Sequence, residues 1–254
     1  MKKLLFAVII LLACCGCEKD DADLTNPTSK ISFVTSRKVG GTIAVTFDED
    51  ELPAKVIGAI PIHEEAIDMD GGIFMAGVVE VTYELTAQTV IIEGDFTGLR
   101  CSENDLTSLD VSQCPHLSYL DCGSNELTVL DLSKNVELKN IACCHNKLAT
   151  LDVSKNSELE ILACYNNQLT VLDLSNNKKL LSLSCYLNDI KADNMLKLTN
   201  SLRQIPLDEP IDPWVYYSAR RLYLYVASAE EGNELPEAAI KIAEDKNWEV
   251  YRQQ

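Results

Sequence analysis

The chain has 254 residues, of which 22 are basic and 39 acidic, so its formal net charge at pH 7 is −17. This charge argues against a nucleic-acid partner, because binding to phosphates needs a basic face. Aromatic residues make up only 6% of the chain while Leu, Val and Ile are plentiful. Such a composition suits thin stacked layers better than one bulky core.

Residues 1–17, "MKKLLFAVIILLACCGC", have the layout of a bacterial export signal: two lysines, a short apolar run, and then small residues and cysteines. The apolar run is shorter than the roughly 20 residues that span a bilayer. The segment resembles a lipoprotein signal, in which a lipidated cysteine becomes the new N-terminus. Cys14 follows a Leu-Leu-Ala box and Cys17 precedes the acidic run "EKDD", so either is a candidate lipidation site. An ordinary secretory signal is the alternative.

Two segments follow the signal. Residues 18–30 are acidic, polar and proline-bearing, which indicates a tether. Residues 31–95 contain alternating apolar and polar runs such as "TIAVTFD" and "VVEVTYEL", which predict a β-rich module. Because a bare end of a repeat array exposes core and strand edge, we expect this module to cap the repeats, with its last strand against the first coil.

Residues 96–190 repeat five times with a period of 21, in the pattern L-x-x-L-x-C-x-x-N-x-L. The repeated cysteines are Cys101, Cys122, Cys143, Cys164 and Cys185, and the repeated asparagines are Asn104, Asn125, Asn146, Asn167 and Asn188. This is the leucine-rich repeat pattern. It predicts an α/β solenoid whose coils stack into a parallel sheet at a spacing of about 4.8 Å. The asparagine amides would satisfy backbone groups where each strand ends.

The repeated cysteines stand at an inward position, where cysteine behaves as a small hydrophobe. Side chains stacked in register point the same way, which does not suit the torsion of a disulfide. We therefore expect buried thiols, with a disulfide or a soft-metal site as alternatives. The pattern resembles the cysteine-ladder repeats of internalin J and, more loosely, other internalin-like surface proteins. It also resembles lipoprotein-anchored leucine-rich repeat proteins of Gram-negative gut bacteria.

Residues 191–254 read as an α/β C-terminal cap. "KADNMLKLTNSL" and "LPEAAIKIAEDKN" have helical patterns, while "RLYLYVA" and "WEVYRQ" alternate as strands. We expect the two strands to extend the parallel sheet as two wider coils.

Motifs for catalysis or metal binding are incomplete. "HEEAI" at His63 lacks the second histidine of a zinc-protease helix, and "DMDGG" at Asp68 has Val79 where a calcium loop needs glutamate. Cys143 and Cys144 are adjacent on a strand and therefore face opposite sides. The sequence thus favours a protein with no enzymatic activity, no cofactor and no metal.

The outward side of the predicted sheet is the candidate ligand face. One expected column holds Arg100, Asp121, Ala142, Ala163 and Ser184, continuing with Tyr223 and Glu249; the next holds Ser102, Gly123, Cys144, Tyr165 and Tyr186, continuing with Tyr225 and Tyr251. Candidate ligand-face residues are Tyr119, His145, Tyr165, Tyr186, Tyr223, Tyr225 and Tyr251. Tyrosine is enriched at binding sites, although cross-strand packing that stiffens the sheet is an equal explanation.

These observations together indicate an exported, lipid-anchored recognition protein of a bacterial outer membrane or cell surface. We expect a protein partner on the concave face of the sheet and contact with the membrane through the lipid anchor only. A glycan-binding surface protein and a structural envelope protein are the alternatives.

Overall fold

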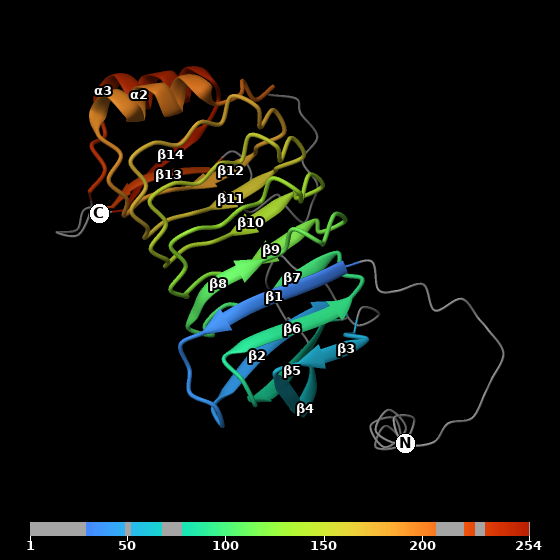
Figure 1. The fold of residues 1–254 in the computed structure, drawn as a ribbon. Helices are drawn as coiled ribbons and strands as arrows, with labels where there is room; N and C mark the ends of the chain where they lie inside the picture. The colour runs from blue at the N-terminus through green and yellow to red at the C-terminus, as the bar shows by residue number, and fades with distance from the viewer. Residues whose placement is uncertain (1–28, 49–51, 68–77, 207–220, 227–231, 254) are drawn as a thin grey trace, which may run out of the picture.

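The computed structural model describes residues 29–48, 52–67, 78–206, 221–226 and 232–253. The predicted signal, with Cys14 and Cys17, and residues 18–28 of the predicted tether lie outside these residues. The described strands form two sheets (Figure 1). One has the order β3-β6-β1-β8, and the other has the order β14-β13-β12-β11-β10-β9-β7-β2-β5-β4.

The N-terminal part is a two-layered β module, because alternating strands bury one face each. Phe33, Val45, Val81 and Ile92 point into the space between the layers, and each is less than a twentieth exposed. The sequence predicted four of its strands but neither β3 nor β4. The strands are β1 (Ser29–Thr35), β2 (Thr42–Asp48), β3 (Lys55–Ile57), β4 (Ala59–Ile67), β5 (Val78–Leu85) and β6 (Thr89–Gly94).

The five coils each contribute one short strand to the larger sheet. These strands are β7 (Gly98–Arg100), β9 (Tyr119–Asp121), β10 (Asn140–Ala142), β11 (Ile161–Ala163) and β12 (Ser182–Ser184). Neighbouring strands are parallel, and equal repeat positions lie side by side, as Leu120 does with Ile141 and Leu162 does with Leu183. The leucine-rich repeats therefore stack into a solenoid, as their period predicts (Figure 1).

The larger sheet is mixed rather than wholly parallel, because a strand of the β module pairs with the strand of the first coil. Strand β2 pairs antiparallel with β7, through Thr46 and Arg100. On the other side of the coil, β1 pairs antiparallel with β8 (Leu106–Asp110). The last strand of the module contacts the first coil, where Gly94 lies against the ring of Phe96, but it does not pair with a strand of that coil. This last strand, β6, lies between β1 and β3, since alternation predicts strands but does not say which strands pair.

The C-terminal part adds two parallel strands, β13 (Arg221–Val226) and β14 (Glu249–Gln253), as the sequence indicated. Helices α2 (Ala192–Ser201) and α3 (Glu237–Asp245) lie together at this end of the molecule (Figure 1). Trp248 is buried after α3, and its indole N–H donates to the carbonyl of Arg203 at 3.0 Å. Within the described residues, no helix is long and apolar enough to cross a membrane.

The outer face of the repeat sheet as a candidate binding site

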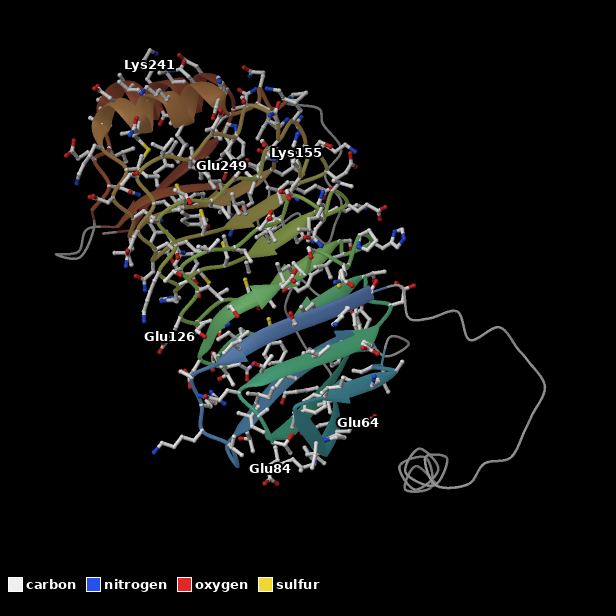
Figure 2. All side chains as sticks on the ribbon, viewed as in Figure 1. Glu64, Glu84, Glu126, Lys155, Lys241 and Glu249 are labelled. Carbon is white, nitrogen blue, oxygen red and sulfur yellow. The ribbon has the colours of Figure 1, made fainter. Side chains whose placement is uncertain are left out.

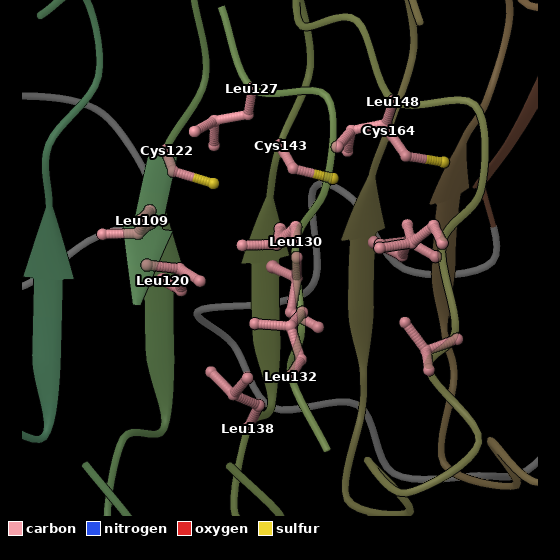
Figure 3. Packing of buried hydrophobic residues seen from close by; sticks show 14 of the residues in the cluster. Leu109, Leu120, Cys122, Leu127, Leu130, Leu132, Leu138, Cys143, Leu148 and Cys164 are labelled. Carbon is pink, nitrogen blue, oxygen red and sulfur yellow. The ribbon is translucent and has the colours of Figure 1, made fainter. Parts of the chain in front are cut away.

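The inward side of each coil fixes the position of the outward side chains. Among the five repeated cysteines, each side chain is buried with a free thiol, as predicted. The sulfur atoms of Cys122, Cys143 and Cys164 point the same way along the stack (Figure 3). Burial raises the pKa of these thiols well above their usual range, so they stay protonated and inert.

The repeated asparagines form a hydrogen-bonded ladder. The amide of Asn146 donates to the carbonyls of Cys122 at 3.0 Å and Cys143 at 3.2 Å, and its Oδ1 accepts from the N–H of Leu127 at 2.9 Å. Each rung thus ties one coil to the coil before it. In the first coil, Asn104 makes the same kind of contact with Ala44 of β2, accepting at 2.9 Å and donating at 2.6 Å. Strand β2 therefore takes the place of a preceding coil.

We call the side of the large sheet that points away from the core the outer face. The strand register arranges its side chains in columns. Column one holds Arg100, Asp121, Ala142, Ala163, Ser184, Tyr223 and Tyr251. Column two continues each coil two residues further along the chain and holds Ser102, Gly123, Cys144, Tyr165 and Tyr186.

Two tyrosines and their neighbours form an aromatic cluster in column two. The rings of Tyr165 and Tyr186 are stacked, with centroids 4.5 Å apart and planes 10° apart. His145 meets Tyr165 edge to face at 5.1 Å, and a hydrogen bond links Tyr165 to the half-buried Cys144. Both tyrosines are partly exposed. The predicted placement of Tyr165 and Tyr186 side by side on one face is therefore confirmed.

Tyr251 occupies a different column from the one predicted. It pairs with Tyr223, and the two rings stack at a centroid distance of 4.9 Å. Tyr225 instead pairs with Arg252, because the register shifts between Tyr223 and Tyr225. Column one therefore ends in Tyr223 and Tyr251 rather than in Tyr223 and Glu249. The side chain of Tyr225 lies outside the described part of the structure.

Tyr119 belongs to a third column and is only 7% exposed, so its ring is not part of an open surface. The guanidinium of Arg100 lies over this ring, 4.6 Å from its centroid, and Arg100 Nε donates to the hydroxyl at 3.3 Å. Sequence periodicity placed Tyr119 on the outer face correctly, but it could not foresee that Arg100 would cover the ring.

A hollow of about 690 Å³ opens beside Arg100, where the β module meets the coils. Strands β2 and β5 contribute Thr46 and Glu80, and the coils contribute Arg100, Asp121 and Ala142, among other residues. Asp121 Oδ1 accepts from the N–H of Gly123 at 3.0 Å. Burial nevertheless raises the pKa of Asp121 above its ordinary value. Within the described residues, no three His, Cys, Asp or Glu side chains are grouped so that they could hold a metal ion.

Each stacked coil carries one cysteine and one asparagine at a fixed position of the repeat. The chain is a leucine-rich repeat protein with a cysteine ladder. It is similar to the functional domain of internalin J from Listeria monocytogenes, which is described as including a cysteine ladder. The identity is 28%, the match covers 63% of this chain and 36% of that chain, and the TM-score is 0.41.

Two further solved structures are similar to this leucine-rich repeat protein. Internalin F from Listeria monocytogenes is 19% identical, over 56% of this chain and 36% of that chain, with a TM-score of 0.39. A leucine-rich repeat protein of Leptospira interrogans is 23% identical, over 56% of this chain and 37% of that chain, with a TM-score of 0.36. The chain thus spans little more than a third of each of these structures. No protein-family model and no curated protein matches it.

Sequence reasoning missed two sets of scaffold residues in this leucine-rich repeat protein. Asn233 forms a further rung of the ladder, because its Oδ1 accepts from the N–H of Ile190 at 2.9 Å. The rung was hidden because the coil of β13 is longer than 21 residues. A second ladder is made by Asn135, Asn156 and Asn177, which are at most 1% exposed. Their 21-residue spacing was visible in the sequence and could have revealed them.

Proposed function

We propose that this leucine-rich repeat protein is a non-catalytic recognition protein that binds a protein partner through the outer face of its sheet. The observation that carries the proposal is the stacked and partly exposed pair of Tyr165 and Tyr186, on the last two coils of that face. A tyrosine offers a large contact area, a polar tip and a low entropic cost of ordering. The concave sheet surface of a solenoid is the usual binding surface of repeat proteins, and we propose that the outer face is this surface.

A protein partner accounts for the surface better than the two alternatives do. A purely structural role for the tyrosines would predict that the rings are covered, as the ring of Tyr119 is, but Tyr165 and Tyr186 stay partly open. Sugar binding favours an aromatic ring whose flat face is open. The ring of Tyr165 is instead stacked against Tyr186 and is in edge-to-face contact with His145. Glycan binding is kept as the second candidate, to be tested in parallel.

The division of the chain follows from the same proposal. Residues 1–17 would direct export, with Cys14 or Cys17 lipidated, and residues 18–30 would tether the repeats to an outer membrane or cell surface. Residues 31–95 and 191–254 would cap the repeats of residues 96–190. In support of the caps, β2 pairs with the first coil and β13 with the last, so neither end of the coil array is left as a bare edge.

Capture of surface proteins by the full chain tests the proposal. The amount of protein captured is compared between the wild type and its variants. We expect a captured protein to be lost when Tyr165→Ala and Tyr186→Ala are combined. The matched control is Val129→Ala with Val171→Ala, which removes exposed side chains, 73% and 50% accessible, from equivalent positions of the return segments. Equal capture by both double variants would reject the outer face as the site. Binding to a glycan array that depends on the tyrosines would support the second candidate instead.

A further inference from the structure

The hollow and the tyrosine pair lie on one continuous surface. Ala142 lines the hollow and also begins a strip of small, half-buried side chains in column one, which continues with Ala163 and Ser184. Tyr165 and Tyr186 stand beside this strip in column two. The far end of the strip is closed by Tyr223, which stacks on Tyr251. Among the described residues, the strip therefore connects a polar hollow with aromatic side chains through small side chains alone.

The hollow carries more acidic than basic groups. Its lining includes the carboxylates of Glu80, Glu103 and Asp121 and the guanidinium of Arg100. Arg100 is held over the ring of Tyr119, on one side of the hollow. The chain as a whole carries a formal charge of −17. Glu64 and Glu84 lie at the module end of the molecule (Figure 2). These charges would attract a cation and exclude an anion.

Strand spacing gives the length of segment that the surface would accept. Asp121 is on β9, and the tyrosine pair follows β11 and β12, two to three strands away. Neighbouring strands are about 4.8 Å apart, so this separation is about 10–14 Å. An extended polypeptide advances about 3.3 Å per residue and covers the separation in three to four residues.

We propose that the partner presents an extended segment that crosses the strands, with a lysine or arginine in the hollow and an apolar or aromatic side chain against Tyr165 and Tyr186. The two side chains would be three to four residues apart. The proposal rests on the proposed function and narrows its partner to a basic polypeptide segment. Asp121 lies beside Arg100 in column one, and Glu80 and Glu103 add two further carboxylates to the lining, so the acidic groups outnumber the basic one and favour a cation of the partner.

Short labelled peptides and the full chain test the proposal by fluorescence anisotropy. The first peptide has arginine and phenylalanine four positions apart in a Gly-Ser background, the second has glutamate in place of the arginine, and the third has the arginine and phenylalanine adjacent. We expect the first to bind at least tenfold more tightly than the second and several-fold more tightly than the third. Its affinity should fall as salt rises, because charge attraction is screened.

Variants of the hollow complete the test. Asp121→Asn with Glu80→Gln should weaken binding of the first peptide about tenfold. Glu126→Gln with Glu137→Gln makes the same change of charge outside the hollow, at exposed carboxylates that contact Lys147 and His116, and should change the affinity for the first peptide less than twofold. Equal binding of all three peptides, no binding of any, or equal effects of the two double variants would overturn the proposal. If a protein is still captured through the tyrosines in those cases, the proposed function stands and only the basic segment is rejected.

Discussion

Among single residues, the repeated asparagines link each coil to the next through hydrogen bonds. Asn146 is 8% exposed, and its side chain makes contacts with the backbone of two coils. We expect Asn146→Ala to lower the free energy of unfolding by about 1–3 kcal/mol, the cost of leaving buried backbone groups unpaired. Urea denaturation measures the change. Asn176→Ala, at an exposed position, is the control, and a loss no larger than the control's would contradict the ladder.

Each asparagine of the second ladder should stabilise the fold less than each asparagine of the first ladder. Asn156 donates to the carbonyls of Leu132 at 3.1 Å and Asn135 at 2.8 Å, but its own Oδ1 is buried without a partner in the described structure. An unpaired buried acceptor offsets part of the gain from the donated bonds. In the same urea experiment, Asn156→Ala should therefore cost less than Asn146→Ala. The opposite order would mean that Oδ1 has a partner, such as a buried water.

The buried thiols give a third prediction at this scale. Because burial keeps the repeated cysteines protonated and inaccessible, a light alkylating reagent should not modify Cys122, Cys143 or Cys164 in the native protein at pH 8. A heavy reagent added after unfolding, without reductant, should then modify all three. Mass spectrometry distinguishes the labels. Light label at these positions would show that the reagent reaches the thiols in the folded protein. The absence of both labels would reveal disulfides or bound metal.

Asp121 should make stability depend on pH. Its pKa is raised by burial, so the folded state binds the proton more tightly than the unfolded state. Stability from this group is present at low pH and is lost as pH rises from the ordinary Asp value through the raised one. Asp121→Asn should therefore raise the melting temperature by about 1–3 °C at pH 7. This gain over the wild type should shrink as pH falls below the ordinary Asp range. A gain that is the same at low and neutral pH would contradict this sign.

At the scale of elements, the joint between the β module and the repeats is a packed contact of aromatic rings. Phe96, at the first leucine-class position, is fully buried, and its ring centroid is 5.2 Å from that of Phe47 on β2. Gly94 leaves room for this ring, because a Cβ there would lie 2.5 Å from it. Phe96→Ala should cost about 3–5 kcal/mol, as large-to-small changes in a core do.

Thermal unfolding of the same variant shows whether the module and the repeats unfold as one unit. We expect one transition in the wild type, because the module and the coils share both a core and a sheet. Phe96→Ala should lower its midpoint or divide it into two. A variant that melts like the wild type would mean that the joint contributes nothing to the cooperativity of the fold.

How far the sequence predicted these elements depended on how strictly it repeats. The 21-residue period placed Tyr165 beside Tyr186 correctly, because equal positions in successive coils must be neighbours. Tyr225 and Tyr251 carry no such constraint. Val250 lies beside Leu222 in the sheet, and this register places Tyr251 beside Tyr223, in the other column. Strand β4 was not predicted because its exposed segment "IPIHEE" hardly alternates, and it contains a proline and a bulge. Both features protect an edge strand from further pairing.

At the scale of the whole molecule, the coils form a rigid support for a small number of exposed groups. The ladders and the core hold every strand of the repeats in register, and the module and the C-terminal strands continue the same sheet. Differences in binding between such proteins would therefore come from outward side chains rather than from the scaffold. The hollow, which is shared by the module and the coils, could not be predicted from the repeat alone, because strands β2 and β5 form one of its sides.

If a protein partner lies on the outer face, site-specific photo-crosslinking should trap it there. A photoreactive residue would replace Ser184, in the strip beside the tyrosine pair, or Val129, which is exposed on a return segment. Each variant would be incubated with cells that carry the partner and would then be irradiated. We predict a protein adduct from position 184 and none from position 129. An adduct from position 129 alone, or no protein adduct from position 184, would show that the partner does not bind the outer face.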